Sequence, residues 1–241
     1  LLRDSEGRAG ASQISKIAVG SGKLLSPPEA PARLLEFVGD SITAGYGNLG
    51  TSANCEYSVE TQSFEQTYGA VAGRFVTADV SAVAVSGRGV YRNFDKTTEG
   101  TMPLLFGQTL ANDPAPQWKP VAAPDVVVVN LGTNDFVGDD PGADFDNAYE
   151  RFAQELRESR PGSYLLFTVG PMLEGPALTH VRDTILAVAL ARRSQGDDRV
   201  GMLEFPREEP ADLGCGYHPN AGKHHAMGEQ LAGFLSQTLG W

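Results

Sequence analysis

Five short, largely apolar segments recur along the sequence, and helix-length stretches separate most of them. We expect strands at residues 34–38, 80–85, 125–131, 164–169 and 200–205, with helices at 64–76, 144–159, 177–193 and from Pro219 to about Leu239. Uninterrupted apolar segments are typical of buried parallel strands. Strands alternating with helices predict a five-stranded, doubly wound parallel sheet of flavodoxin-like type, enclosed in a three-layer α/β/α sandwich. Residues 93–119 have no clear periodicity beyond a helical turn near 104–106.

The first 33 residues differ from the rest, so we divide the chain into residues 1–33 and an α/β domain at 34–241. Ile14, Ile17 and Val19 predict a strand, and Pro27, Pro28 and Pro31 predict an extended linker. One strand cannot form a core. The segment is therefore either the end of a β domain that precedes residue 1 or an edge addition to the main body.

Polar residues follow the expected strands at one edge of the sheet. Ser41 follows the first strand, Gly87 the second and Asn134 the third, while His218 lies in the loop after the fifth. In open α/β sheets, ligands bind outside the carboxyl ends of the strands. A serine, an imidazole and donors for an oxyanion are what acyl transfer requires. We expect Ser41 as nucleophile, His218 as base, and the Ser41 N–H, the Gly87 N–H and the Asn134 amide as oxyanion hole.

Composition limits the partners of this site. The formal net charge of the 241 residues is −11, which argues against nucleic acid and anionic membrane surfaces. No apolar run approaches the roughly 20 residues of a membrane span. A neutral substrate fits better, and the oligomeric state is left open.

The four blocks resemble the GDSL, or SGNH, hydrolase superfamily, which is named for such residues in this order. GDSITAGYG and NLGTND carry the resemblance most specifically. Three blocks, GDSITAGYG, SGRGVYRN and GCGYHPN, are also similar to those of the second carbohydrate esterase family. Members of that family are acetylxylan esterases with a β-sandwich before the catalytic domain. The resemblance implies a serine esterase without metal or cofactor that removes O-acetyl groups from acetylxylan or a related plant polysaccharide. It also implies that residues 1–33 end such a sandwich.

One position departs from the superfamily. An aspartate usually stands two or three residues before the histidine, where this chain has Gly216 and Cys215. That aspartate normally orients the imidazole and stabilises its charged form. Asp212, Glu208 and Glu209 lie near in sequence only. We therefore expect a Ser–His dyad in which a main-chain carbonyl of residues 214–216 accepts from Nδ1.

The two cysteines, Cys55 and Cys215, lie in loops at the same edge of the sheet. Two buried thiols are one alternative, and a disulfide is the one we favour. A bond would hold the turn before His218 and its carbonyl against the imidazole. It would also imply an oxidising, secreted or periplasmic location.

Other polar residues have simpler interpretations. We expect Asp40 and Asp135 to accept from loop N–H groups, and His180 to be a surface residue. His224 and His225 are adjacent on a helix and point about 100° apart, so we expect no metal site there. Tyr217 either binds a sugar ring or packs, and Trp118 is either a loop anchor or a sugar platform.

The sequence also allows two rival functions. One is a lipase- or thioesterase-like hydrolase of other acyl esters, although no mobile apolar loop is evident. The other is a non-catalytic carbohydrate-binding relic of the fold, which the missing aspartate would allow.

Overall fold

A computed structural model describes residues 4–7, 10, 13–110, 113–118 and 122–241. Five parallel strands form the main sheet in the order β2-β1-β5-β6-β7: β1 (Arg33–Gly39), β2 (Ala78–Ala84), β5 (Val126–Asn130), β6 (Tyr164–Val169) and β7 (Val200–Glu204). Taken as five successive strands, this is the 2-1-3-4-5 order of flavodoxin-like sheets, and the predicted fold class is confirmed. The order reverses between β1 and β5, which creates the crevice where such sheets bind ligands.

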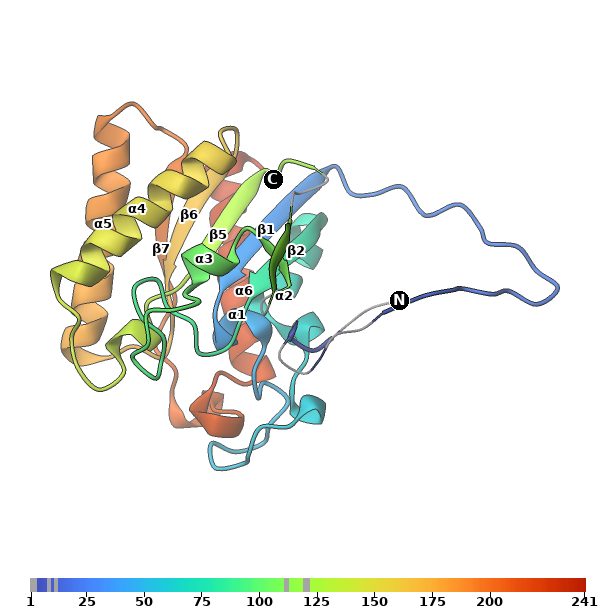
Figure 1. Ribbon diagram of the computed structural model, residues 1–241, viewed down its shortest axis with the longest axis horizontal. Coiled ribbons are helices and arrows are strands. Elements are labelled where there is room, and N and C mark those ends of the chain that lie inside the picture. The colour runs from blue at the N-terminus through green and yellow to red at the C-terminus, as the bar shows by residue number, and fades with distance from the viewer. Residues whose placement is uncertain (1–3, 8–9, 11–12, 111–112, 119–121) are drawn as a thin grey trace.

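Helices cover both faces of the sheet (Figure 1). The longer helices are α2 (Tyr68–Val76), α4 (Ala143–Ser159), α5 (Gly175–Ser194) and α6 (Ala221–Leu239), and the single turns are α1 (Ser41–Ala44) and α3 (Met102–Leu105). Successive strand residues point to opposite faces. Val127 and Val129 therefore enter the core beneath α4 and α5, whereas Val126 and Val128 enter the core beneath α2 and α6.

The structure corrects several expected elements. Residues 13–32 contain no helix or strand, so the strand expected near Ile14 and Val19 is absent, as befits a segment without a partner strand. The expected 64–76 helix is split, because Thr67 caps α2 and leaves a separate 3₁₀ turn at Phe64–Gln66. Asn220, not Pro219, begins α6, since its side chain accepts from the N–H of Lys223 at 3.0 Å.

A small antiparallel hairpin was not anticipated from the sequence. It pairs β3 (Gln108–Leu110) with β4 (Asp113–Gln117) within the stretch expected to be irregular. Prolines 114 and 116 disfavour a strand prediction, because proline is confined to edge positions in sheets. That residues 1–33 end a preceding β-sandwich stays a prediction.

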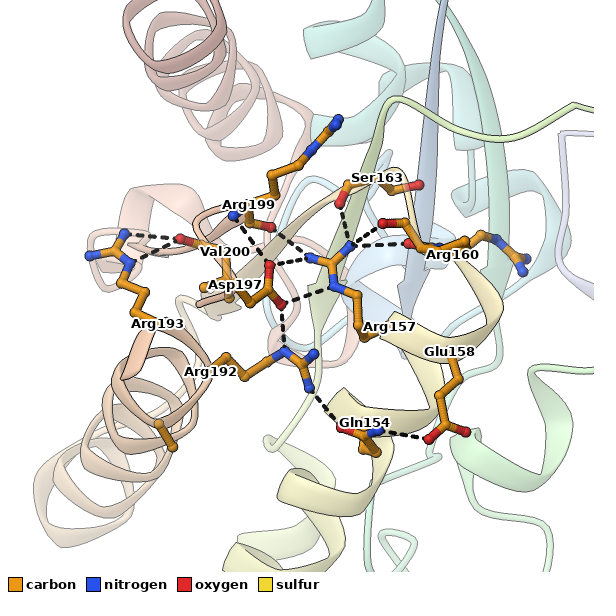
Figure 2. A network of polar contacts seen from close by, with 12 residues as sticks. Gln154, Arg157, Glu158, Arg160, Ser163, Arg192, Arg193, Asp197, Arg199 and Val200 are labelled. Atoms are coloured by element: carbon orange, nitrogen blue, oxygen red, sulfur yellow. Dashed lines mark hydrogen bonds and ion pairs between the residues drawn. The ribbon is translucent and has the colours of Figure 1, made fainter. Parts of the chain in front are cut away.

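Polar networks hold together the edge of the sheet where the strands begin. At the end of α4, the Arg157 guanidinium binds the Asp197 carboxylate and the carbonyls of Ser163 and Arg199 (Figure 2). Beside it, Arg160 makes a two-pronged ion pair with Glu36 of β1, at 2.8 and 2.9 Å. These contacts join α4 to β1, β6 and β7 on the side opposite the carboxyl ends of the strands.

The Glu36–Arg160 pair is nearly inaccessible to water, with side chains 1% and 7% exposed. Breaking a buried pair leaves one charge uncompensated and costs about 3–5 kcal/mol. We predict that Glu36→Ala lowers the free energy of unfolding by that amount, measured by urea denaturation. The control is Glu229→Ala at the exposed His225–Glu229 pair, which should cost less than about 1 kcal/mol. Equal effects of both substitutions would contradict the prediction.

Candidate active site

Ser41 is presented by the sharp transition from β1 to α1. Asp40 caps the helix turn, its Oδ1 accepting from the Ile42 N–H at 3.0 Å. At Gly39, a Cβ would lie 2.0 Å from Oγ1 of Thr43, so only glycine permits this close turn. The serine is 8% exposed and lies beside the crevice between β1 and β5.

The His218 imidazole bridges Ser41 and a main-chain carbonyl. Its Nε2 lies 2.8 Å from Oγ of Ser41, and its Nδ1 lies 2.9 Å from the Gly216 oxygen. Because a carbonyl can only accept, Nδ1 carries the proton and Nε2 is the acceptor for the serine hydroxyl. Burial lowers the pKa of His218, against an opposing effect of the Gly216 carbonyl. The ring is therefore neutral at pH 7, as a general base requires.

The carboxylates near in sequence do not contact the imidazole of His218. Asp212 accepts from the N–H of Glu209 at 3.0 Å and lies 3.2 Å from the Lys223 ammonium. Burial raises the pKa of Glu208 to about 7. Among the described residues, no carboxylate oxygen contacts Nδ1 of His218, so the expected carbonyl support is what the structure contains.

An unusual turn directs that carbonyl. Gly216 and Tyr217 both have left-handed backbone conformations, with φ of 62° and 60°. The conformation is strained for tyrosine, at a cost of order 1–3 kcal/mol. Two hydrogen bonds offset the strain: the Tyr217 N–H donates to Ala53 O at 3.3 Å, and its hydroxyl donates to Asn54 Oδ1 at 2.9 Å.

A disulfide between Cys55 and Cys215 joins the same two segments, as expected. The Gly216 N–H also donates to the Cys55 carbonyl at 3.1 Å, and the Cys215 N–H to Gly47 O at 3.0 Å. A Cβ at Gly50 would lie 2.4 Å from Sγ of Cys215. Glycine at position 50 thus lets the loop after the nucleophile pack directly on the bridge.

The three groups expected to bind an oxyanion lie in loops at the carboxyl ends of three strands. The N–H groups of Ser41 and Gly87 have no hydrogen-bond acceptor among the described residues. The Asn134 amide donates to Oδ2 of Asp40 and to the Arg88 carbonyl, both at 3.0 Å. Asp40 thereby fixes the amide plane and leaves the other N–H directed towards the Gly87 turn.

Asp40 and Asp135 accept from loop N–H groups, as expected. Asp135 is inaccessible and accepts from the N–H groups of Val90, Tyr91 and Arg92 at 2.7–3.1 Å. Burial raises the pKa of Asp40 to about 7, against the lowering effect of the Ile42 N–H, and Asp135 raises it further. Burial also raises the pKa of Asp135. These carboxylates shape the loops around the site.

Aromatic rings that sequence reasoning missed flank the imidazole. Tyr46 lies against His218 with ring centroids 4.5 Å apart, and Tyr57 stacks on Tyr46 with ring centroids 4.1 Å apart. Tyr46 belongs to the GDSITAGYG block, and membership of that block was the only indication in the sequence that it lies at the site. Tyr217, 58% exposed, lies beside His218 where a sugar-binding role stays a prediction.

Trp118 does not join this group. Its ring lies 5.8 Å from the Arg160 guanidinium, at the edge where the strands begin. The loop-anchor interpretation therefore fits Trp118, and this location does not support the sugar-platform interpretation. No sequence pattern predicted the hairpin that places Trp118 at the edge opposite His218.

The remaining histidines do not converge. Nδ1 of buried His224 accepts from the Tyr68 N–H at 3.2 Å, whereas His225 lies at the surface beside Glu229. His180 is not the plain surface residue we expected. Its two nitrogens each lie 2.9 Å from a carboxylate, of Asp140 and Asp146, and Phe136 and Phe145 pack against its ring.

Comparison with known proteins now gives the family. Residues 37–226 match the model of the GDSL-like Lipase/Acylhydrolase family. The chain belongs to this family. The cellulase/esterase CelE of Acetivibrio thermocellus is 32% identical over all of this chain but only 30% of its own length. An acetylxylan esterase / glucomannan deacetylase of Cellvibrio japonicus is 26% identical, over all of this chain and 67% of the relative.

A solved structure shares the fold of this chain. A family two carbohydrate esterase from Clostridium thermocellum, in complex with cellohexaose, is 33% identical with a TM-score of 0.88, covering 92% of this chain and 69% of that one. Among the described residues, no helix has the length and apolarity to cross a membrane.

The disulfide closes a loop with a sequence separation of 160 residues, for which the chain-entropy model gives about 5 kcal/mol. We predict that Cys55→Ala/Cys215→Ala lowers the free energy of unfolding by up to this amount, measured by urea denaturation. Reductant should destabilise the wild-type chain similarly and leave the double variant unaffected. Unchanged stability in the double variant would contradict the prediction.

His180 should make stability depend on pH. A neutral imidazole cannot donate to both carboxylates, so the paired geometry requires its charged form. Burial alone would lower the pKa of His180, but the hydrogen bonds and charges of Asp140 and Asp146 outweigh it and raise the pKa. The resulting stabilisation is fully present below the unfolded pKa of about 6.5 and is lost as pH rises through the raised folded value.

We therefore predict that His180→Gln costs more unfolding free energy at about pH 5.5 than at about pH 9. Denaturant titrations of both proteins at the two pH values measure the difference. A cost that is independent of pH would mean that the ion pairs do not form.

Proposed function

We propose that this chain is a serine esterase that removes O-acetyl groups from carbohydrate, of acetylxylan esterase type. The observation that carries the proposal is the continuous contact from Ser41 Oγ through the His218 ring to the Gly216 carbonyl. The names of the relatives support the reaction class and the carbohydrate substrate. The polysaccharide and a secreted or periplasmic location belong to the proposal, and the disulfide supports that location.

The mechanism follows from the proton positions. Oγ of Ser41 attacks the acetyl carbonyl while Nε2 of His218 takes its proton. The Gly216 carbonyl keeps the Nδ1 proton in place, so Nε2 is always the nitrogen that faces the serine. The same proton then passes to the departing sugar oxygen, leaving an acetyl ester on Ser41. Water, deprotonated by Nε2, attacks this ester, and Nε2 then gives the proton to Oγ of Ser41 as the bond to the acyl group breaks and acetate departs.

The oxyanion that forms in each step needs preorganised donors. The N–H groups of Ser41 and Gly87 are available without rearrangement. The Asn134 N–H that now donates to the Arg88 carbonyl is the one that would serve the oxyanion, while Asp40 holds the other. A small rotation of the Asn134 side chain, rather than a loop movement, would bring this N–H to the oxyanion as the third donor.

Binding of a glucan chain at the same site is a second candidate function. The solved relative in complex with cellohexaose favours it. The missing aspartate also favours it, because a carbonyl stabilises the charged imidazole less than a carboxylate does. The two functions need not exclude each other. If both use this site, a bound glucan would inhibit deacetylation competitively.

One set of assays separates these functions. Turnover is measured on p-nitrophenyl acetate, butyrate and octanoate, and acetate release on acetylated xylan and glucomannan, with and without cellohexaose. Preference for acetate with acetate release supports the proposal. Preference for octanoate would indicate a lipase-like enzyme. Binding of cellohexaose without any turnover would indicate the non-catalytic alternative.

We predict that Ser41→Ala and His218→Ala each abolish turnover while the far-ultraviolet circular dichroism is unchanged. Asn134→Ala should lower kcat by roughly two orders of magnitude with little change in KM, because its amide acts on the developing oxyanion. Steady-state kinetics on p-nitrophenyl acetate measure all three. Substantial activity in either dyad variant would remove the assignment, and a pure KM effect at Asn134 would place it in ground-state binding.

A further inference from the structure

A short segment before the α/β domain docks beside the candidate site. The Asp4 carbonyl accepts from the Phe64 N–H at 3.0 Å. Its carboxylate Oδ1 accepts from the Ser63 hydroxyl at 3.1 Å and from the Glu65 N–H at 2.9 Å. These bonds span about sixty positions in sequence and fix the segment that contains Glu6 against the domain.

Glu6 then reaches the loop that follows β2. Its side chain is buried, with the residue 9% exposed. Oε2 accepts from the Ser86 N–H at 2.9 Å, and Oε1 accepts from the Ser86 hydroxyl at 2.7 Å. A carboxylate that binds both donors of one residue fixes the rotation of that residue and not only its position.

The residue that Glu6 binds is the second position of a tight turn, Val85 to Arg88. The Arg88 N–H donates to the Val85 carbonyl at 3.3 Å, and Gly87, the third position, has φ of +80°. Ser86 does not have a positive φ, so this is a type II turn. The N–H of its central peptide is that of Gly87, the oxyanion donor assigned above.

The direction of that N–H depends on the turn type. Types I and II share similar end positions but differ by roughly a half-rotation of the central peptide. In a type I turn, the Gly87 N–H would therefore point roughly opposite to its direction in this structure. Other bonds hold the turn on both sides of its central peptide: the Val85 N–H donates to Gly39 O at 3.1 Å, and the Gly87 carbonyl accepts from the Phe94 N–H at 2.9 Å. Glu6 acts on the residue whose ψ changes in the flip.

We propose that Glu6 is a positioning residue for the oxyanion hole, which holds the Ser86–Gly87 peptide in the orientation that presents the Gly87 N–H. The inference rests on the proposed esterase function and deepens it. It assigns part of the catalytic geometry to a segment that lies outside the α/β domain.

The experiment compares Glu6→Ala, Glu6→Gln and Asp4→Ala in the full 241-residue chain. Glu6→Ala removes both acceptors and should lower kcat on p-nitrophenyl acetate about ten- to a hundred-fold, with KM unchanged, because a donor for the transition state is lost. Glu6→Gln keeps both hydrogen bonds, its oxygen accepting from the Ser86 N–H and its amide donating to the hydroxyl. It should retain wild-type kcat.

Asp4→Ala is the matched control, since it removes the side-chain bonds to Ser63 and Glu65. It keeps the bond from the Phe64 N–H to the carbonyl of residue 4 and both bonds from Glu6 to Ser86. It should lower Tm about as much as Glu6→Ala while leaving kcat close to wild type. Equal kcat in wild type and Glu6→Ala, or equal kcat losses in Glu6→Ala and Asp4→Ala, would overturn the proposal.

If Glu6→Ala does not fold, Glu6→Asp decides the question, because its shorter side chain keeps the charge but cannot reach both Ser86 donors. Wild-type kcat in Glu6→Asp would overturn the proposal, and a lowered kcat with unchanged KM would support it. A wild-type chain without turnover on any ester would instead refute the proposed function, and this inference with it.

Discussion

The hydrogen bond from Nδ1 of His218 to the Gly216 carbonyl is the interaction on which the candidate site depends. It sets the tautomer and so decides that Nε2 accepts from Ser41. A carboxylate would do the same and also stabilise the imidazolium with a full charge. A carbonyl offers only a dipole, so its effect depends on distance and direction. The chain holds this carbonyl with a disulfide, two left-handed residues and main-chain bonds to residues 47, 53 and 55.

The proposed oxyanion donors depend on one another in a similar way. The Val85 N–H binds the Gly39 carbonyl, so the Gly87 turn is fixed to the residue that precedes Asp40. Asn134 binds Asp40 and the Arg88 carbonyl, so the end of β5 is fixed to both. The three donors thus belong to a single hydrogen-bonded unit across β2, β1 and β5. This explains how two main-chain N–H groups and one side-chain amide from three loops keep a common geometry.

The sequence was sufficient to predict the sheet, its helices and the four residues at its carboxyl edge, because apolar periodicity and strand-end positions follow local rules. It also indicated the Cys55–Cys215 bond, since both cysteines flank that edge. It could not predict contacts that depend on tertiary distance alone. Glu6 and His180 have no local signal, because their partners lie about 80 and 40 residues away. The positive φ of Tyr217 breaks a local preference and exists only because residues 53 and 54 accept its donors.

Buried carboxylates around a site that must stabilise negative charge present an electrostatic difficulty. Glu6, Asp40 and Asp135 all lie near the proposed oxyanion hole and would repel a developing anion if their charge were free. Each one instead accepts from two or more N–H or O–H donors, and burial raises the pKa of Asp40 to about 7. Their effect on the donors is mainly geometric. Asp40 holds one N–H of the Asn134 amide, and Glu6 holds Ser86, the residue before Gly87. These two carboxylates therefore bear directly on the direction of the proposed oxyanion donors, whereas Asp135 fixes the neighbouring loop.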